Sequence, residues 1–212
     1  MVCRKIIVFG GSGATGKALI NAAIERGLKV TTLVRNSSSA RFPSAVEVIT
    51  GDLTSDDHLD RVMEGSDAVI ILFGPRPPYT DIFCRDTTSS IISAMKRAGI
   101  KRLICQTGAM IGHYQANRTL PFRIMTNLFN RRMPTLAADR SGQEQLVMES
   151  GLDWTIIKPP RLTDGKDSGR WTAGEDVRVG LLSSITRGDL SRFILDMTFG
   201  SNLSECRLFI KN

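Results

Sequence analysis

Short, almost continuous apolar runs alternate along this chain with segments of helix length. Continuous apolar runs are buried on both faces, so they indicate a parallel sheet covered by helices. We therefore predict an α/β fold: a Rossmann-type doubly wound parallel sheet of about seven strands with helices on both faces. The strand candidates are Lys5–Phe9, Val30–Val34, Val46–Ile49, Ala68–Phe73, Arg102–Cys105, Trp154–Ile157 and Arg207–Ile210.

The segments between these runs have the pattern of amphipathic helices that end at glycine. In the first such segment, Leu19, Ile20 and Ala23 fall on one helical face. Glycines lie where four helices are expected to end: Gly27, Gly65, Gly99 and Gly151. The sequence contains no internal repeat, low-complexity tract or linker. Residues 1–212 are therefore predicted to form a single domain.

A long gap separates the strand candidates that end at residue 105 and begin at residue 154. It contains an apolar stripe at roughly helical spacing: Phe122, Met125, Phe129 and Met133. The stripe either packs into the core or forms a wall of a substrate pocket. We expect a small substrate-side region from about residues 108–135 and 161–186.

A glycine-rich turn follows the first strand candidate directly. Its residues are Gly10, Gly11, Ser12, Gly13, Ala14, Thr15 and Gly16, which satisfy the pattern G-x-G-x-x-G. Glycine permits a tight turn and close approach of backbone to a pyrophosphate, and the following helix N-terminus attracts phosphate. A strand before the turn and a helix after it make this context typical of dinucleotide binding. We predict that these seven residues bind the cofactor.

Arg35 directly follows the second strand candidate, where an NAD-selective protein usually has an acidic residue. A guanidinium can form paired hydrogen bonds with a ribose 2′-phosphate, and the nearby Ser38 hydroxyl can add another. We therefore predict binding of NADP(H) rather than NAD(H). The alternative is that Arg35 is a solvated loop charge.

Several stretches together resemble one family almost from end to end. They are Ile6–Gly16, Leu33–Arg35, residues 51–53, Ile70–Arg76, residues 94–96, 149–152 and 158–160, and Thr186–Leu190. The chain resembles the atypical short-chain dehydrogenases/reductases of the NAD(P)H-binding, NmrA-like group. Within that group it is most similar to the flavin (biliverdin B-type) reductases.

The resemblance implies further cofactor contacts at the carboxyl ends of the strands, where open α/β sheets bind ligands. They are Asp52 and Leu53 at the adenine, Phe73, Gly74 and Arg76 at the ribose and pyrophosphate, Thr107 at the nicotinamide, and Pro159, Pro160 and Arg161 at its amide, with Gly108 completing the set. Asp52 also admits a local interpretation, because Gly-Asp after a strand can form an Asx turn.

The Tyr-x-x-x-Lys pair of many short-chain dehydrogenases is missing. Tyr79 is followed at that spacing by Phe83, and Tyr114 by Arg118. An arginine keeps its proton and is a poor relay, so we interpret Tyr114 as an exposed loop aromatic. The resemblance implies direct hydride transfer to a bound flavin or tetrapyrrole, with solvent supplying the proton.

Thr107 is the candidate catalytic hydroxyl, with a simple hydrogen bond at the strand end as the alternative. Arg140 stands where the reductase relatives can carry histidine, which leaves the acceptor open. We interpret Asp139, Arg140 and Glu144 as a solvated helix face. Trp171 is either a hairpin or a pocket aromatic, and Asp189 is expected early in a helix, where its charge suits the helix dipole.

Two function hypotheses follow. The first is an NADPH-dependent reductase of a flavin, quinone or similar conjugated acceptor, with flavin as a substrate rather than a prosthetic group. The second is an NADP(H)-binding redox sensor without strong catalysis. The four cysteines are scattered and the histidines are isolated, so we predict no metal site and a reducing, cytoplasmic location.

The net charge of +7 is concentrated in two parts of the chain. Residues 1–53 carry an excess of four positive charges and residues 118–161 an excess of three, while the remainder is balanced. These parts contain the glycine turn and the expected substrate border, so the charge favours small anionic ligands. We predict a small-molecule acceptor, no nucleic-acid or membrane partner, and a monomer or weak homo-oligomer.

Overall fold

A computed structural model gives the fold and describes residues 4–35, 41–75, 79, 82–200 and 204–212. The order of elements is β1 (Lys5–Phe9), α1 (Ala14–Glu25), β2 (Lys29–Val34), β3 (Val46–Thr50), α2 (Asp56–Met63), β4 (Ala68–Ile71), α3 (Cys84–Ala98), β5 (Arg102–Gln106), α4 (Leu120–Arg132), α5 (Pro134–Met148), β6 (Asp153–Lys158), β7 (Arg161–Thr163), β8 (Thr172–Gly174), β9 (Ser184–Thr186), α6 (Arg187–Phe199) and β10 (Cys206–Lys211).

The central sheet has the order β3-β2-β1-β4-β5-β6-β10-β8. The seven strands from β3 to β10 run parallel, which confirms the predicted doubly wound sheet and all seven strand candidates. β8 adds an antiparallel edge strand against β10, which the apolar pattern did not predict. Outside this sheet, β7 and β9 form a parallel two-stranded ribbon.

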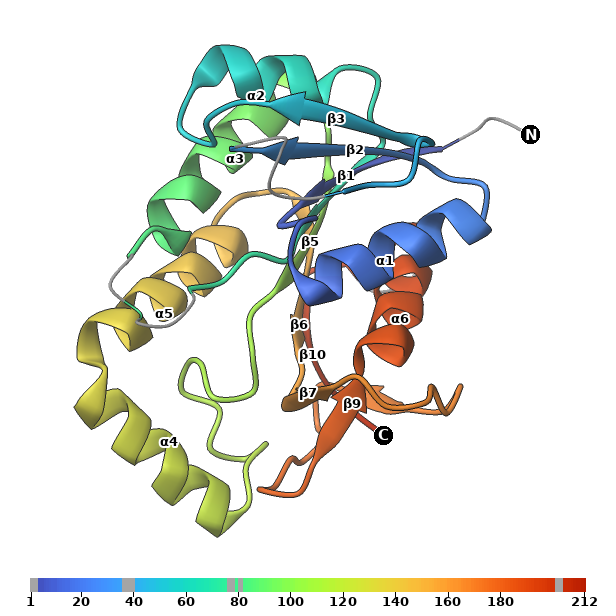
Figure 1. Cartoon of the computed structure of the whole chain (residues 1–212). Coiled ribbons are helices and arrows are strands. Elements are labelled where there is room, and N and C mark those ends of the chain that lie inside the picture. Colours follow the sequence, from blue (N-terminus) through green and yellow to red (C-terminus); the bar gives the residue numbers. More distant parts are fainter. Residues whose placement is uncertain (1–3, 36–40, 76–78, 80–81, 201–203) are drawn as a thin grey trace.

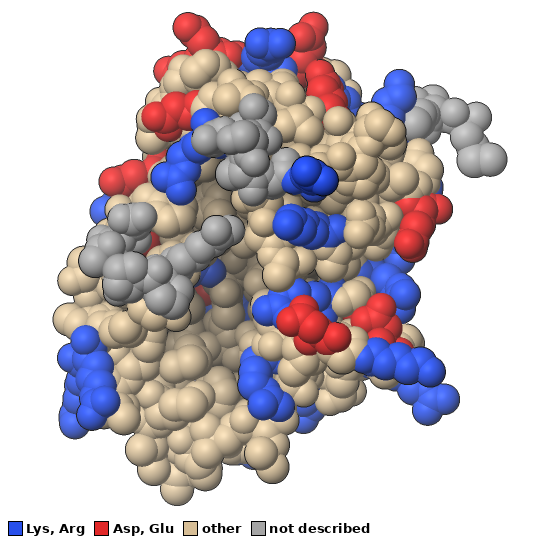
Figure 2. Space-filling view, viewed as in Figure 1, with Lys and Arg blue, Asp and Glu red and all other residues tan. Residues whose placement is uncertain are grey.

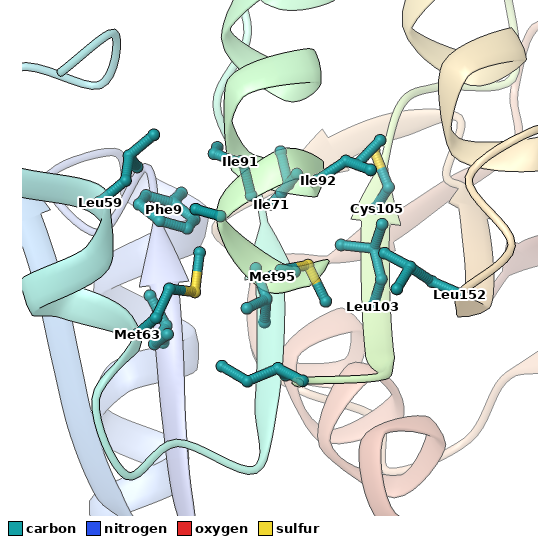
Figure 3. Packing of buried hydrophobic residues seen from close by; sticks show 14 of the residues in the cluster. Phe9, Leu59, Met63, Ile71, Ile91, Ile92, Met95, Leu103, Cys105 and Leu152 are labelled. Atoms are coloured by element: carbon teal, nitrogen blue, oxygen red, sulfur yellow. The ribbon is translucent and has the colours of Figure 1, made fainter. Parts of the chain in front are cut away.

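Helices cover both faces of the sheet (Figure 1). On one face, α2, α3 and α5 pack over a cluster that includes Phe9, Ile71 and Leu103 (Figure 3). On the other face, α1 and α6 bury a second cluster that includes Val8, Leu19 and Phe193. The sheet strands are buried on both sides for this reason, as their continuous apolar runs predicted.

The predicted glycine stops are confirmed. Gly27, Gly65, Gly99 and Gly151 all have positive φ angles between 64° and 72°, a backbone region that side chains with a Cβ rarely enter. Thr186 caps the start of α6: its hydroxyl accepts a hydrogen bond from the Asp189 amide, so Asp189 lies in the first turn as expected. No helix within the described ranges is both long and apolar enough to cross a membrane.

α4 lies apart from these two layers, at the lower left of the molecule, and packs mainly against α5 (Figure 1). Beneath it is a small apolar cluster of Ala109, Phe122, Val179 and Phe209. The chain reaches α4 from β5 and returns through α5 to β6. α4 therefore faces the carboxyl ends of β5 and β6.

Candidate active site

The carboxyl ends of the parallel strands meet at one edge of the sheet, and the strand order reverses between β1 and β4. Ligands of doubly wound sheets bind at such a switch point. The glycine turn leaves β1 there and lies against the segment after β4. A Cβ on Gly10, whose φ is +88°, would lie 2.7 Å from the Phe73 amide nitrogen, so only glycine fits.

The glycine turn leads directly into α1. A Cβ on Gly16 would lie 2.2 Å from the Gly10 carbonyl oxygen, so the helix and the turn touch through backbone. α1 starts after Gly13 with no side chain capping its first turn. The first amides of a helix have no carbonyl partner within it, which is the arrangement that binds phosphate. The turn therefore fits a dinucleotide pyrophosphate.

The structure places the predicted ribose and adenine residues at the same edge. Arg35 is exposed at the end of β2. Asp52, after β3, accepts hydrogen bonds from the Thr54 amide and hydroxyl, both at 2.9 Å, and these bonds hold its pKa below the usual range. Asp52 therefore forms the Asx turn that its local interpretation predicted. Ser38 and Arg76 lie outside the described residues.

A cavity of about 550 Å³ opens at the ends of β5 and β6. The predicted residues Thr107, Gly108, Pro159, Pro160 and Arg161 line its sheet side. The opposite wall is the apolar stripe, Phe122, Met125, Phe129 and Met133, so the stripe is a cavity wall rather than only core. Figure 2 shows this face of the molecule hollowed at its centre, with tan side chains below the hollow.

A buried polar network lies behind the cavity wall at Thr107. The Thr107 hydroxyl donates to Glu144 Oε1, and the Lys158 ammonium forms an ion pair with that same oxygen. Lys158 Nζ is also 3.4 Å from Thr107 Oγ1. On the far side, the Tyr114 hydroxyl donates to Glu144 Oε2 at 3.1 Å. Lys158 and Glu144 are both buried, with side chains 0% and 3% exposed.

Burial sets the titration of this network. Desolvation lowers the pKa of Lys158 to about 8, and the positive charges of Arg118 and Arg140 add to the shift against the attraction of Glu144. Desolvation and the Glu144 carboxylate raise the pKa of Tyr114 to about 12, so its hydroxyl keeps its proton. The lysine is therefore the group in this network that can lose a proton near neutral pH.

The interpretation of Asp139, Arg140 and Glu144 as a solvated helix face is wrong, because all three are buried. Arg140 donates to the carbonyls of Phe73, Gln106 and Thr107 at 2.9–3.3 Å and thereby ties the ends of β4 and β5 together. Asp139 accepts the Cys84 and Arg85 amides at the start of α3. Unsatisfied carbonyls and helix amides need such partners.

The interpretation of Tyr114 as an exposed loop aromatic is also wrong. The ring is half-buried, packs edge-on against Phe209, and has the Lys158 ammonium 4.5 Å from its centroid. Arg118 is buried and donates to the carbonyls of Ala109 and Ile111 in the cavity wall, both at 2.8 Å. Trp171 packs against Phe193 in the core and not in the cavity.

The sequence does not predict Lys158, Glu144 or Tyr114 as site residues. One signal could have found Glu144. Leu136 and Val147 are eleven positions apart on α5, which places Arg140, Gln143 and Glu144 on the face that they define. Among the described residues, no group of three His, Cys, Asp or Glu side chains could hold a metal ion.

Solved structures share this fold over nearly the whole chain. The anaerobilin reductase ChuY of Escherichia coli O157:H7 is 17% identical, with a TM-score of 0.79 over 98% of this chain and 96% of its own. A short-chain dehydrogenase/reductase of Veillonella parvula, solved with NADP, is 14% identical, with a TM-score of 0.81 over 99% and 94%. At this identity, the likeness shows the fold alone.

Curated relatives are similar in sequence. YwnB of Bacillus subtilis is 28% identical over 178 residues, which cover 81% of this chain and 80% of YwnB. The NAD(P)H azoreductase of Xenophilus azovorans is 29% identical over 156 residues, 73% of this chain but only 47% of the azoreductase. This chain likewise covers 62% of a chloroplast protein from Arabidopsis thaliana. The model of one family, described as NAD(P)H-binding, matches residues 10–199, so the chain belongs to the NAD(P)H-binding family.

Proposed function

We propose that this chain is an NADPH-dependent reductase that acts on a flavin, quinone or similar conjugated acceptor. The observation that carries the proposal is the position of Thr107. Thr107 lines the apolar cavity, and its hydroxyl contacts the buried pair of Lys158 and Glu144 behind the cavity wall. Family membership and the similarity to an azoreductase support a reductase over other nucleotide-dependent reactions.

The glycine turn, Arg35, Asp52 and the strand-end residues Phe73 and Gly74 would hold the NADPH. When bound, its nicotinamide supplies a hydride, the two electrons that a conjugated acceptor takes up. The apolar wall formed by α4 orients a flat acceptor and excludes water from it.

Reduction of such an acceptor also consumes a proton. In our proposal the Thr107 hydroxyl turns from Glu144 toward the cavity, gives its proton to the reduced acceptor and takes one from the Lys158 ammonium. Glu144 holds both groups in place and accepts a hydrogen bond from Tyr114, and Lys158 regains a proton from solvent between turnovers. Thr107 is thus the catalytic residue, Lys158 resupplies its proton, and Glu144 and Tyr114 position both groups.

The test is steady-state NADPH oxidation with FMN, FAD, biliverdin and quinones. Thr107→Val should lower kcat about 100-fold, the lower end of general acid catalysis, while Thr107→Ser should stay within a few-fold of the parent. If Thr107→Val turns over normally, solvent supplies the proton and the role of Thr107 is wrong. Tight NADPH binding with no turnover of any acceptor would overturn the reductase and favour the NADP(H)-sensing alternative.

The pH profile of kcat tests the relay separately. The pKa of Lys158 lies at about 8, and its protonated form is the donor, so kcat should fall as pH rises through that value. Lys158→Arg keeps the positive charge beside Glu144 but holds its proton at all accessible pH values. We expect that variant to show low kcat, an unchanged NADPH affinity and no fall near pH 8. A parent profile that is flat across this range would contradict the relay.

A further inference from the structure

α4 is apolar on two opposite faces. Its inner face carries Phe122, Met125 and Phe129, which line the cavity. Its outer face carries Leu120, Ile124 and Leu128 at intervals of four residues, and these are 67%, 62% and 48% exposed. Apolar side chains gathered on one exposed face of a helix often mark a binding surface, and this outer face is uncovered by the described part of the chain.

The apolar surface continues onto the loop before β9. The Thr119 amide donates to the Val179 carbonyl at 3.0 Å, so this loop runs beside the start of α4. It carries Leu182, which is 92% exposed, and Leu181, which is 51% exposed and also lines the cavity. We call Leu120, Ile124, Leu128 and Leu182 the outer α4 patch. Four of the eight exposed large apolar side chains of the described residues belong to it, so exposed apolar surface is concentrated there.

Positive charge accompanies the outer α4 patch. α4 contains Arg123, Arg131 and Arg132 and no acidic residue. Arg131 follows Leu128 by three residues and therefore lies on the same side of the helix, and both Arg131 and Arg132 are exposed. The neighbouring loop carries both signs, with residues 175 and 176 acidic and residue 178 basic. Figure 2 shows blue and tan atoms over α4, at the lower left, and no red.

We propose that the outer α4 patch binds an anionic lipid surface. Leucine and isoleucine would enter the boundary between head groups and acyl chains, and the arginines would pair with lipid phosphates, as in amphipathic helices that lie on membranes. The charge favours this occupant over a second copy of the chain, because stacking α4 on α4 would bring exposed arginines of both copies together, with no acidic residue on either helix to balance them. The proposal differs from the sequence-based expectation of no membrane partner and does not depend on the reductase activity.

The test is flotation of the full chain with two kinds of vesicle, phosphatidylcholine alone and phosphatidylcholine mixed with phosphatidylglycerol. We expect binding to the anionic vesicles only, weakened by salt. The triple variant Leu120→Gln/Ile124→Gln/Leu128→Gln should lose binding. Arg131→Gln/Arg132→Gln should lower the partition coefficient about 25-fold, from roughly fivefold for each arginine near the surface. Val48→Gln/Ile82→Gln, two exposed apolar residues elsewhere, should bind like the parent.

Sedimentation of each variant without lipid completes the test. A dimer that the triple variant converts to monomer, with no vesicle binding by the parent, would overturn the proposal and assign the patch to a second copy. Vesicle binding that survives the triple variant would also overturn it, since charge alone would then suffice. The substituted side chains are exposed, so an unchanged thermal transition is expected and excludes unfolding as the cause of lost binding.

Discussion

The candidate site has two ends, the glycine turn and the network at Thr107, and they are built from different parts of the chain. At the glycine turn, backbone forms the site, and the side chains that accompany it, such as Arg35 and Asp52, are exposed. At Thr107, charged side chains form the site, and Lys158 and Glu144 are removed from water altogether. The first end therefore depends on the absence of Cβ atoms, whereas the second depends on charge balance in a region that water does not screen.

The largest effect should come from breaking the charge balance. Lys158→Met leaves the Glu144 carboxylate buried without its cation and should lower the free energy of unfolding by about 3–5 kcal/mol, measured by urea denaturation. The double variant Lys158→Met/Glu144→Leu should recover most of that loss but not the turnover. A single variant as stable as the parent would show that the pair is not coupled.

At the glycine turn the corresponding change is steric. Gly16→Ala places a Cβ against the Gly10 carbonyl oxygen and Gly11 Cα, both backbone atoms that cannot rotate away. We expect a loss of about 3 kcal/mol in NADPH binding, roughly 100-fold in the dissociation constant. Gly165→Ala is the matched control, since a Cβ there meets nothing within 4 Å. Equal affinity in both variants would remove the turn from the cofactor site.

Asp139 is a buried charge that we expect to stabilise the fold without taking part in turnover. Asp139→Asn weakens the hydrogen bonds to the first two amides of α3 and should lower the free energy of unfolding by about 2 kcal/mol. Turnover per folded molecule should stay close to the parent value. Asp86→Asn, an exposed acid in the same helix turn, should cost about 0.5 kcal/mol. Similar losses in the two variants would contradict the capping role.

The smallest effect is expected at the exposed end of β2. Arg35→Ala should weaken NADPH binding about tenfold, the low end for a charge-assisted hydrogen bond in water, and leave NADH binding unchanged. Lys29→Ala, at the opposite end of the same strand, should change neither. The parent preference for NADPH should also diminish with added salt. Equal affinities for both cofactors in the parent chain would refute the prediction.

The difference between the two ends also explains what the sequence could predict. Strand positions and helix stops follow from local patterns, and the glycine turn is seven consecutive residues, so Gly10 to Gly16 were recognised directly. The network of Thr107, Tyr114, Glu144 and Lys158 comes from separate elements, and only Glu144, through its position on the buried face of α5, has a local sign of burial. The strand β8 was not predicted, because its three residues form no apolar run and pair only with β10.

Asp139 and Arg140 are adjacent on α5 and have opposite charges, and both are buried against backbone groups of opposite polarity. If α5 docked one residue out of step, a carboxylate would face the strand-end carbonyls and a guanidinium would face the amides of α3. Both contacts would be repulsive, so the wrong alignment is penalised twice. The pair thus selects a single docked position for α5, which is a gain in conformational uniqueness that measurements of stability alone would not reveal.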